Sequence, residues 1–233
     1  MIEDTDIETY ITISNNYYGI YLFDKKKINN LYKKDIEIKN NTSLDLDYLD
    51  EFLNDNIFKI EKKFGKFIKN IFLIIESKKI QNINLGIKKK NFNKLVNKID
   101  LENIITEAKD LFKENYPDHK IMHIVLNNCF ANGVSYSPLM NDLETDYLCV
   151  ELKFISIHHD LVFELNKVLE KYQIQITQYV DGLYVKNFFK NENYEFSKKI
   201  YKILEGFNDK EVTVIKKNLK KKGFFEKFFQ LFS

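Results

Sequence analysis

The sequence predicts an α+β protein. Hydrophobic residues make up 44% of its 233 positions, enough to bury the core of one long domain or of two small ones. Runs rich in β-branched and aromatic residues alternate with segments whose apolar residues recur every three or four positions. In the middle of the chain these segments follow the order strand, helix, strand, strand, helix, strand, which is typical of an α+β module.

Residues 1–77 are expected to form a first subdomain. Two β-rich runs in ETYITISNNYYGIYLFD are separated at Asn15 and Asn16, which indicates a hairpin, and LYKKDIEI adds a third strand. A helix should follow in LDLDYLDEFLNDNIFKIEKKF, with Ser43 as its cap. Its apolar stripe comprises Leu46, Leu49, Leu53, Ile57, Ile60 and Phe64. IKNIFLIIES is then typical of a buried strand.

Residues 78–180 are expected to form a second subdomain. IQNINLGI predicts a strand, and a helix should run from about Asn91 to Glu114, where Tyr116 and Pro117 mark its end. KIMHIVLNNCF and DYLCVELKFISI predict two long strands, joined by a loop that contains Gly and Pro. LVFELNKVLEKY predicts an amphipathic helix and QIQITQYV a strand. Further on, NYEFSKKIYKILEGF predicts a helix and EVTVIKK a short strand.

The last residues, KKKGFFEKFFQLFS, form the most distinctive segment. On a helical wheel one face, spanning about 160°, holds all the large apolar residues: Phe224, Phe225, Phe228, Phe229, Leu231 and Phe232. The lysines just before it are Lys216, Lys217, Lys220, Lys221 and Lys222. Five Phe beside a run of Lys suit the interface of an anionic bilayer, so these residues are predicted to bind membrane lipids. The alternative is a terminal helix that docks on the protein's own core.

Charge and composition exclude several kinds of function. The formal net charge is only +2, and all 36 cationic residues are Lys, so no Arg offers bidentate phosphate recognition. We therefore expect no nucleic-acid partner. The N-terminus is acidic and no segment resembles a signal peptide or a transmembrane helix, which predicts a cytoplasmic location. Cys129 and Cys149 are expected to be reduced.

Motifs for catalysis, metal binding or cofactor binding are not recognised in the sequence, so we expect no enzyme. His119, His123, His158 and His159 lack a ligand set that would complete a tetrahedral site, and strand-edge or helix-capping roles are expected instead. G-x-S-x-G, P-loop and G-x-G-x-x-G motifs do not occur. The carboxylate pairs Asp45/Asp47 and Asp50/Glu51 lie on the polar face of the predicted helix, where solvation is the expected role.

Several of these segments, in the same order, resemble FtsA, the actin-like bacterial cell-division protein. FIKNIFLIIES resembles a strand of its first subdomain, and the helix around IDLENIITEAKDLF resembles a helix of the subdomain peculiar to FtsA. In HIVLNNCFANGVSYSPLMND, the residues that match the family pattern are His123, Ile124, Val125, Asn127, Asn132 and Pro138. GFFEKFFQLFS resembles the amphipathic membrane-targeting helix of that family.

The resemblance implies four parts: a partial actin-like sheet with its helix (1–77), the FtsA-specific subdomain (78–180), a remnant helix and strand that return to the first subdomain (181–215), and a basic linker with the membrane-targeting helix (216–233). The family's first phosphate loop, Asp-x-Gly-(T/S), is replaced by Ile13-Ser14-Asn15-Asn16, and the second does not follow Val185. Nucleotide binding is therefore not expected.

The resemblance implies a non-enzymatic adaptor of cell division, held on the inner face of the cell membrane. Its expected partners are anionic lipids and later division proteins, with FtsZ reached indirectly and with self-association through the FtsA-specific subdomain. Independently of the resemblance, the β-rich N-terminal edge offers a way to pair into dimers or filaments. The alternatives are an adaptor like PilM of type IV pili, which lacks such a tail, a soluble interaction domain with its tail docked, and a nucleotide-binding enzyme.

Overall fold

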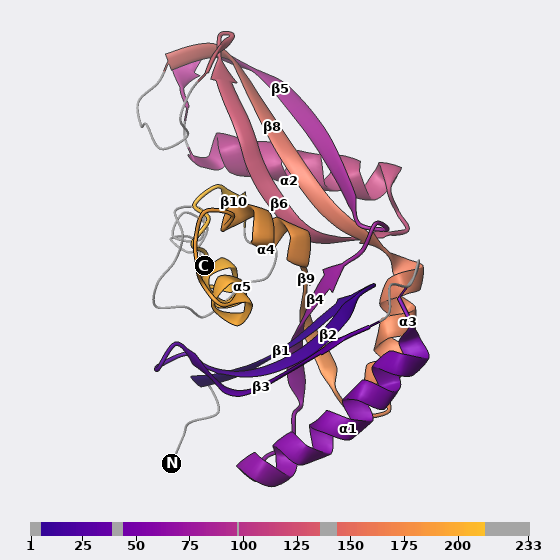
Figure 1. Ribbon diagram of the computed structural model, residues 1–233. Helices are drawn as coiled ribbons and strands as arrows, with labels where there is room; N and C mark the ends of the chain where they lie inside the picture. The colour runs from indigo at the N-terminus through magenta and orange to yellow at the C-terminus, as the bar shows by residue number, and fades with distance from the viewer. Residues whose placement is uncertain (1–5, 39–43, 97, 136–143, 213–233) are drawn as a thin grey trace. The chain divides into compact units, whose positions relative to one another are not determined.

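The computed structural model describes residues 6–38, 44–96, 98–135 and 144–212, which form two compact units (Figure 1). Of the described residues, those up to Ile80 form the first unit together with His158–Leu204, and Gln81–Ile157 form the second together with those from Glu205 to Val212. The described residues form five α-helices and two five-stranded sheets, which confirms the α+β class.

The sheet of the first unit is mixed. Its strands are β1 (Ile7–Ser14), β2 (Tyr17–Asp24), β3 (Asn29–Glu37), β4 (Asn70–Glu76) and β9 (Gln175–Asp181), in the order β3-β2-β1-β4-β9. The hairpin predicted at Asn15 and Asn16 is confirmed, because β1 and β2 pair antiparallel on either side of it. β4 lies parallel to β1 and to β9, and parallel neighbours need long crossover connections, so each of these pairs is separated by at least one helix along the chain.

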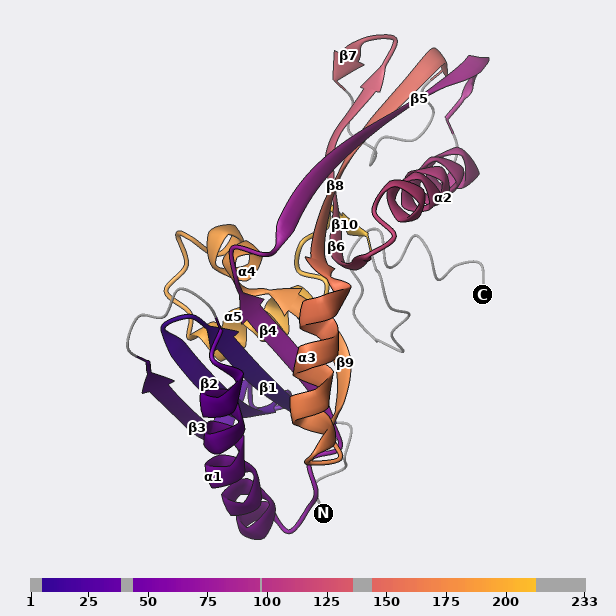
Figure 2. The same cartoon turned by 90° about the vertical axis from the view of Figure 1, so that its right-hand side faces the viewer.

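Helices cover both faces of this sheet (Figure 2). α1 (Leu46–Phe64) and α3 (His159–Glu170) lie on one face, and α4 (Gly182–Phe188) and α5 (Phe196–Leu204) lie on the other. A strand covered on both faces is buried at successive positions rather than at alternate ones. β1 and β2 show this, since every residue from Thr9 to Ser14 and from Tyr18 to Asp24 is buried.

Helix α1 follows the predicted pattern, with a different cap. Leu49, Leu53 and Ile57 of the expected stripe are buried. The side chain of Asp45 accepts a hydrogen bond from the Tyr48 amide at 3.0 Å and so caps the helix, whereas Ser43 lies outside the described residues. The helix ends at Gly65, whose φ of 66° suits glycine.

The second unit places one helix against its own sheet. The strands are β5 (Gln81–Leu95), β6 (His119–Ala131), β7 (Val134–Ser135), β8 (Glu144–His158) and β10 (Glu211–Val212). Their order is β10-β6-β8-β5, and β7 pairs with β6. α2 (Lys98–Asn115) packs on this sheet through an apolar cluster in which Phe112 stacks on Phe154 at a centroid distance of 4.9 Å.

The helix expected from about Asn91 begins later than predicted. β5 continues to Leu95, and its pairing with β8 resumes after an irregularity between Lys90 and Lys94. Phe92 and Asn93 have φ values of 54° and 53° at this irregularity, which keeps them out of a helix. Backbone pairing with a strand about 50 residues away overrides the local helical pattern.

The predicted six-element subdomain of residues 78–180 is also wrong in its second half. β9 pairs with β4 in the first unit, where Val180 lies opposite Ile74, and α3 belongs to that unit as well. Conversely β10, expected to return to the first subdomain, pairs with β6 in the second unit, where Val212 lies opposite Ile124. Element order alone does not decide these pairings, because a strand can join any edge that its connection reaches.

Candidate functional site

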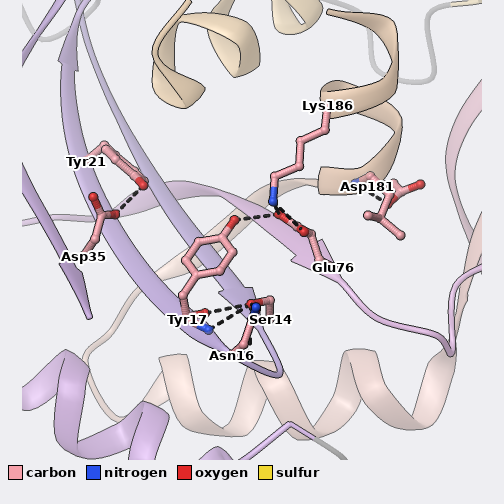
Figure 3. A network of polar contacts seen from close by, with 9 residues as sticks. Ser14, Asn16, Tyr17, Tyr21, Asp35, Glu76, Asp181 and Lys186 are labelled. Atoms are coloured by element: carbon pink, nitrogen blue, oxygen red, sulfur yellow. Dashed lines mark hydrogen bonds and ion pairs between the residues drawn. The ribbon is translucent and has the colours of Figure 1, made fainter. Parts of the chain in front are cut away.

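The turn between β1 and β2 is closed by its own polar side chains. Ser14 Oγ donates to Asn16 Oδ1 at 2.7 Å and accepts a hydrogen bond from the Tyr17 amide at 3.0 Å (Figure 3). Ser14 is buried. Ser14 to Tyr17 therefore form a tight turn held by a serine hydroxyl.

Beside this turn, three side chains from distant parts of the chain meet. The Tyr17 hydroxyl donates to Glu76 Oε1 at 2.6 Å, and Lys186 Nζ lies 2.6 and 2.7 Å from the two Glu76 oxygens. Lys186 also lies 5.1 Å from the ring centroids of Tyr17 and Phe196. We call Tyr17, Glu76 and Lys186 the central network; Figure 3 shows its phenol and ammonium groups converging on the carboxylate.

The elements that bring the central network together fit closely at their ends. Glu76 is the last residue of β4, and Lys186 lies on α4, which Asp181 caps by accepting a hydrogen bond from the Leu183 amide at 3.0 Å. A Cβ atom on Gly182 would lie 2.5 Å from Glu76 Cγ, so only glycine leaves room for this carboxylate. The absence of a side chain at Gly182, the first residue of α4, therefore leaves the space that Glu76 occupies.

A second polar contact lies next to the network on β2 and β3. The Tyr21 hydroxyl donates to Asp35 Oδ1, directly above Gly19. Lys33 Nζ lies 3.7 Å from Asp35 and 3.3 Å from Glu195. Burial, followed by the adjacent carboxylates, raises the pKa values of Tyr17 and Tyr21, so both phenols stay protonated and act as donors.

An open hollow of about 810 Å³ borders these contacts. Its lining includes Tyr17, Tyr21, Lys33, Asp35, Glu37, Lys186 and Phe196. The carboxylates and the ammonium groups at this site neutralise one another, and the phenols are poor bases. The arrangement suits binding of a polar surface or the structural filling of a space, and it offers no activated nucleophile.

The histidines have separate roles. His158 caps α3, since its Nδ1 accepts a hydrogen bond from the Asp160 amide at 3.2 Å, which is the capping role expected for one of them. His123 is fully buried and lies 2.6 Å from Glu211, and His119 lies 3.2 Å from Ser156. Over the described ranges, no three His, Cys, Asp or Glu residues gather as metal ligands would.

Other sequence predictions have mixed outcomes. Cys129 and Cys149 are free thiols. Asp50 is more than solvated, because it accepts hydrogen bonds from Lys171 at 2.6 Å and from the Tyr172 hydroxyl at 2.7 Å. The lipid-binding residues predicted between Lys216 and Phe232 lie outside the described residues. Within the described part, no helix has both the length and the apolar character needed to cross a membrane.

Sequence reasoning did not identify the central network. Its members lie at the start of β2, the end of β4 and the middle of α4, and none belongs to a recognised motif. The one local signal is Asp181-Gly182 at the end of a strand, where an N-cap precedes a helix.

Comparisons with known proteins give fold similarity alone. No protein-family model and no curated protein matches the chain. Among solved structures, it is similar to the PilM–PilN type IV pilus biogenesis complex, with 9% identity, a TM-score of 0.49 and coverage of 78% of this chain and 49% of that chain. It is also similar to the cytoplasmic domain of EpsL, an inner membrane component of the type II secretion system of Vibrio cholerae. There the identity is 7%, the TM-score 0.37 and the coverage 77% of this chain and 57% of that one.

A third similar structure is a Bacteroides thetaiotaomicron protein with an actin-like ATPase fold. Its identity is 16% and its TM-score 0.37, with coverage of 82% of this chain and 60% of that one. The chain thus matches about half to three fifths of the length of these structures. None of the three is FtsA, so the resemblance to that family stays a prediction.

Proposed function

We propose that this protein is a non-enzymatic adaptor that binds other proteins. The observation that carries the proposal is the central network, which places the Glu76 carboxylate beside the β1–β2 turn. In the resembled family that turn holds a nucleotide phosphate. Here a phosphate would meet the Glu76 carboxylate, and the Tyr17 phenol and the Lys186 ammonium are already bonded to it. Repulsion between the two anions and the loss of these bonds both oppose nucleotide binding.

We further propose that the adaptor works in a membrane-associated assembly of the pilus or secretion kind. PilM is named together with PilN in a type IV pilus complex, and EpsL is named as an inner membrane component of a secretion system. An adaptor of the pilus kind lacks a C-terminal membrane-targeting tail, so this version of the proposal depends only on residues that the structure describes. For that reason we place it ahead of the cell-division version.

The division adaptor is the second candidate, and the sequence of the tail favours it. Segregation of five Phe and one Leu from the polar residues of the tail, next to lysines, supports attachment to anionic lipids. Co-sedimentation with anionic and neutral vesicles tests this attachment. We expect salt-sensitive binding by the full chain and none by a chain that ends at Ile215; equal recovery of the two chains would contradict attachment through the tail.

Calorimetry with ATP and Mg²⁺ tests the adaptor function at the site itself. We expect no binding heat from the full chain, in conditions where an ATP-binding actin-like protein gives a clear signal. Binding of ATP at micromolar strength would overturn the proposal.

The kind of assembly is tested by pairwise co-purification. The full chain is expressed with the cytoplasmic segments of inner-membrane pilus, secretion or division proteins from the same cell, one at a time. We expect retention of a pilus or secretion component. Retention of a division protein alone would favour the second candidate, and retention of none of them would contradict both.

A further inference from the structure

Two hollows in the first unit share one wall. Each has a volume of about 420–430 Å³, within the range of roughly 300–1,000 Å³ that is usual for binding pockets. Both are lined by Phe67, Ile68 and Lys69, the link between α1 and β4. The first hollow extends toward Tyr172, and the second toward Leu22. Together they form what we call the Phe67 groove.

The floor of the Phe67 groove is apolar and firmly held. Ile57, Ile60 and Ile68 are buried there. The Ile68 amide donates to Glu61 Oε1 at 2.9 Å, which fixes the link against the helix. Because the pocket is already formed in the free protein, binding of a partner would cost little conformational entropy.

Two phenylalanines stand exposed at the groove. Phe67 is 79% exposed and Phe58, nearly two turns before the end of α1, is 69% exposed. A single exposed apolar side chain needs no explanation, whereas two aromatic rings beside preformed apolar hollows have the features of a protein-binding surface. Aromatic residues next to pockets commonly dominate the energy of such interfaces.

The rim of the groove is basic. Lys66, Lys69 and Lys171 line the two hollows, and Glu61 is the one acidic residue among the described lining residues. The lining thus carries three ammonium groups against one carboxylate, and its net charge stays positive when Asp50, the partner of Lys171, is counted with it. The potential at the rim therefore favours an acidic partner.

We propose that the Phe67 groove binds a segment of a partner protein that combines large apolar side chains with Asp or Glu. Two adjacent hollows accommodate two apolar side chains of one segment, on either side of Phe67, while its acidic residues face the lysines. A bilayer surface would contact exposed phenylalanines without filling hollows, so a protein segment fits the shape better. The inference rests on the proposed adaptor function, to which it adds a binding surface and the chemistry of the partner.

The test uses a phage-displayed library of random 12-residue peptides, selected on the full chain, with affinities then measured by fluorescence anisotropy on the synthetic peptides. We expect the selected peptides to carry two or more large apolar residues and a net negative charge. Phe67→Ala should weaken their binding about 30-fold, the size of an aromatic hot spot. The matched control is Phe163→Ala, because Phe163 is 60% exposed on α3, also has a lysine near its ring and lies outside the groove.

Charge is tested separately. Lys66→Glu combined with Lys69→Glu should weaken the same peptides about tenfold or more at low salt, and less at high salt. Lys78→Glu with Lys79→Glu serves as the control, since both lysines are exposed in the same unit and away from the groove. All four positions are on the surface, so the variants should fold like the natural chain.

Three outcomes would overturn the inference. One is a selection that yields no peptide dependent on Phe67. Another is binding of the natural chain to anionic vesicles that Phe67→Ala abolishes, which would make the groove a lipid contact. The third is concentration-dependent self-association that the same variant removes, which would make it a contact between two copies. None of these outcomes depends on ATP, so failure of the groove and failure of the adaptor function remain distinguishable.

Discussion

Replacing Gly19 with alanine tests how closely the side chains around Gly19, at the edge of the candidate site, pack against β2. Gly19 lies on β2 between Thr12 of β1 and Asp35 of β3. A Cβ atom at Gly19 would lie 2.5 Å from Thr12 Oγ1, 2.6 Å from Asp35 Oδ1 and 2.9 Å from the Tyr21 hydroxyl oxygen. Each distance is shorter than a Cβ atom tolerates, so three side chains would have to move at once.

The expected cost follows from how freely those side chains can move. Thr12 is fully buried within the sheet, which restricts its displacement. Asp35 can turn toward solvent, but it then loses the hydrogen bond from Tyr21. Overpacking of this kind costs about 2 kcal/mol of unfolding free energy, which corresponds to roughly 4–8 °C in the melting temperature of a chain of this size.

Urea and thermal denaturation of the full chain, followed by far-ultraviolet circular dichroism, measure this cost. Gly86→Ala is the matched control: Gly86 also lies in a strand, and a Cβ atom there meets nothing within 4 Å. We expect the control to change the unfolding free energy by less than about 0.5 kcal/mol. If Gly19→Ala were no less stable than Gly86→Ala, the reasoning that Thr12, Tyr21 and Asp35 leave no room for a Cβ atom at Gly19 would be refuted.

Three further predictions concern the two units separately. Asp45→Ala should lower the unfolding free energy by about 1 kcal/mol in urea denaturation, because it removes the cap of α1; an unchanged value would mean that the cap contributes nothing. The hydrogen bond from Lys171 lowers the pKa of Asp50 in the folded protein. The ionised Asp50 side chain therefore stabilises the fold at pH values above its unfolded-state pKa of about 3.9, and this stabilisation is lost as the pH falls through the lower folded-state pKa. Asp50→Asn should therefore be less stable than the natural chain at pH 7, and the difference should disappear as the pH falls through the lowered folded pKa of Asp50; a difference that does not shrink in acid would contradict this. Burial, with a smaller effect of Cys149, raises the pKa of Cys129 to about 11. Iodoacetamide at pH 8 should therefore modify Cys129 at least about tenfold more slowly than Cys149, which peptide mass spectrometry would measure. Equal rates would argue against the burial of Cys129.

Local patterns predicted most of the individual elements. The spacing of Leu49, Leu53 and Ile57 predicted α1, and the Asn15-Asn16 pair predicted the first hairpin, because both signals depend on neighbours within a few residues. The boundary between β5 and α2 was missed, because the residues from Asn91 to Leu95 have helical spacing and extend β5 only through their pairing with β8.

The candidate site was less predictable than the fold. The turn at Asn15 and Asn16 was predicted, because its signal lies within a few residues. The partners of Tyr17 were not recognised, because Glu76 and Lys186 are 59 and 169 positions further along the chain (76 − 17 and 186 − 17) and belong to no motif. The Phe67 groove was missed for a similar reason, since a phenylalanine in a short link gives no sign in the sequence of whether it is buried or exposed.

The sequence by itself determined the α+β class, the stripe of α1 and the first hairpin, since each depends on side chains close together along the chain. Only the tertiary structure decided that β9 joins the first sheet and β10 the second, and that Glu76 bonds to both Tyr17 and Lys186. Strand pairing and salt bridges of this kind depend on which surfaces meet after the chain has folded, and any of several edges and carboxylates would satisfy the same local pattern.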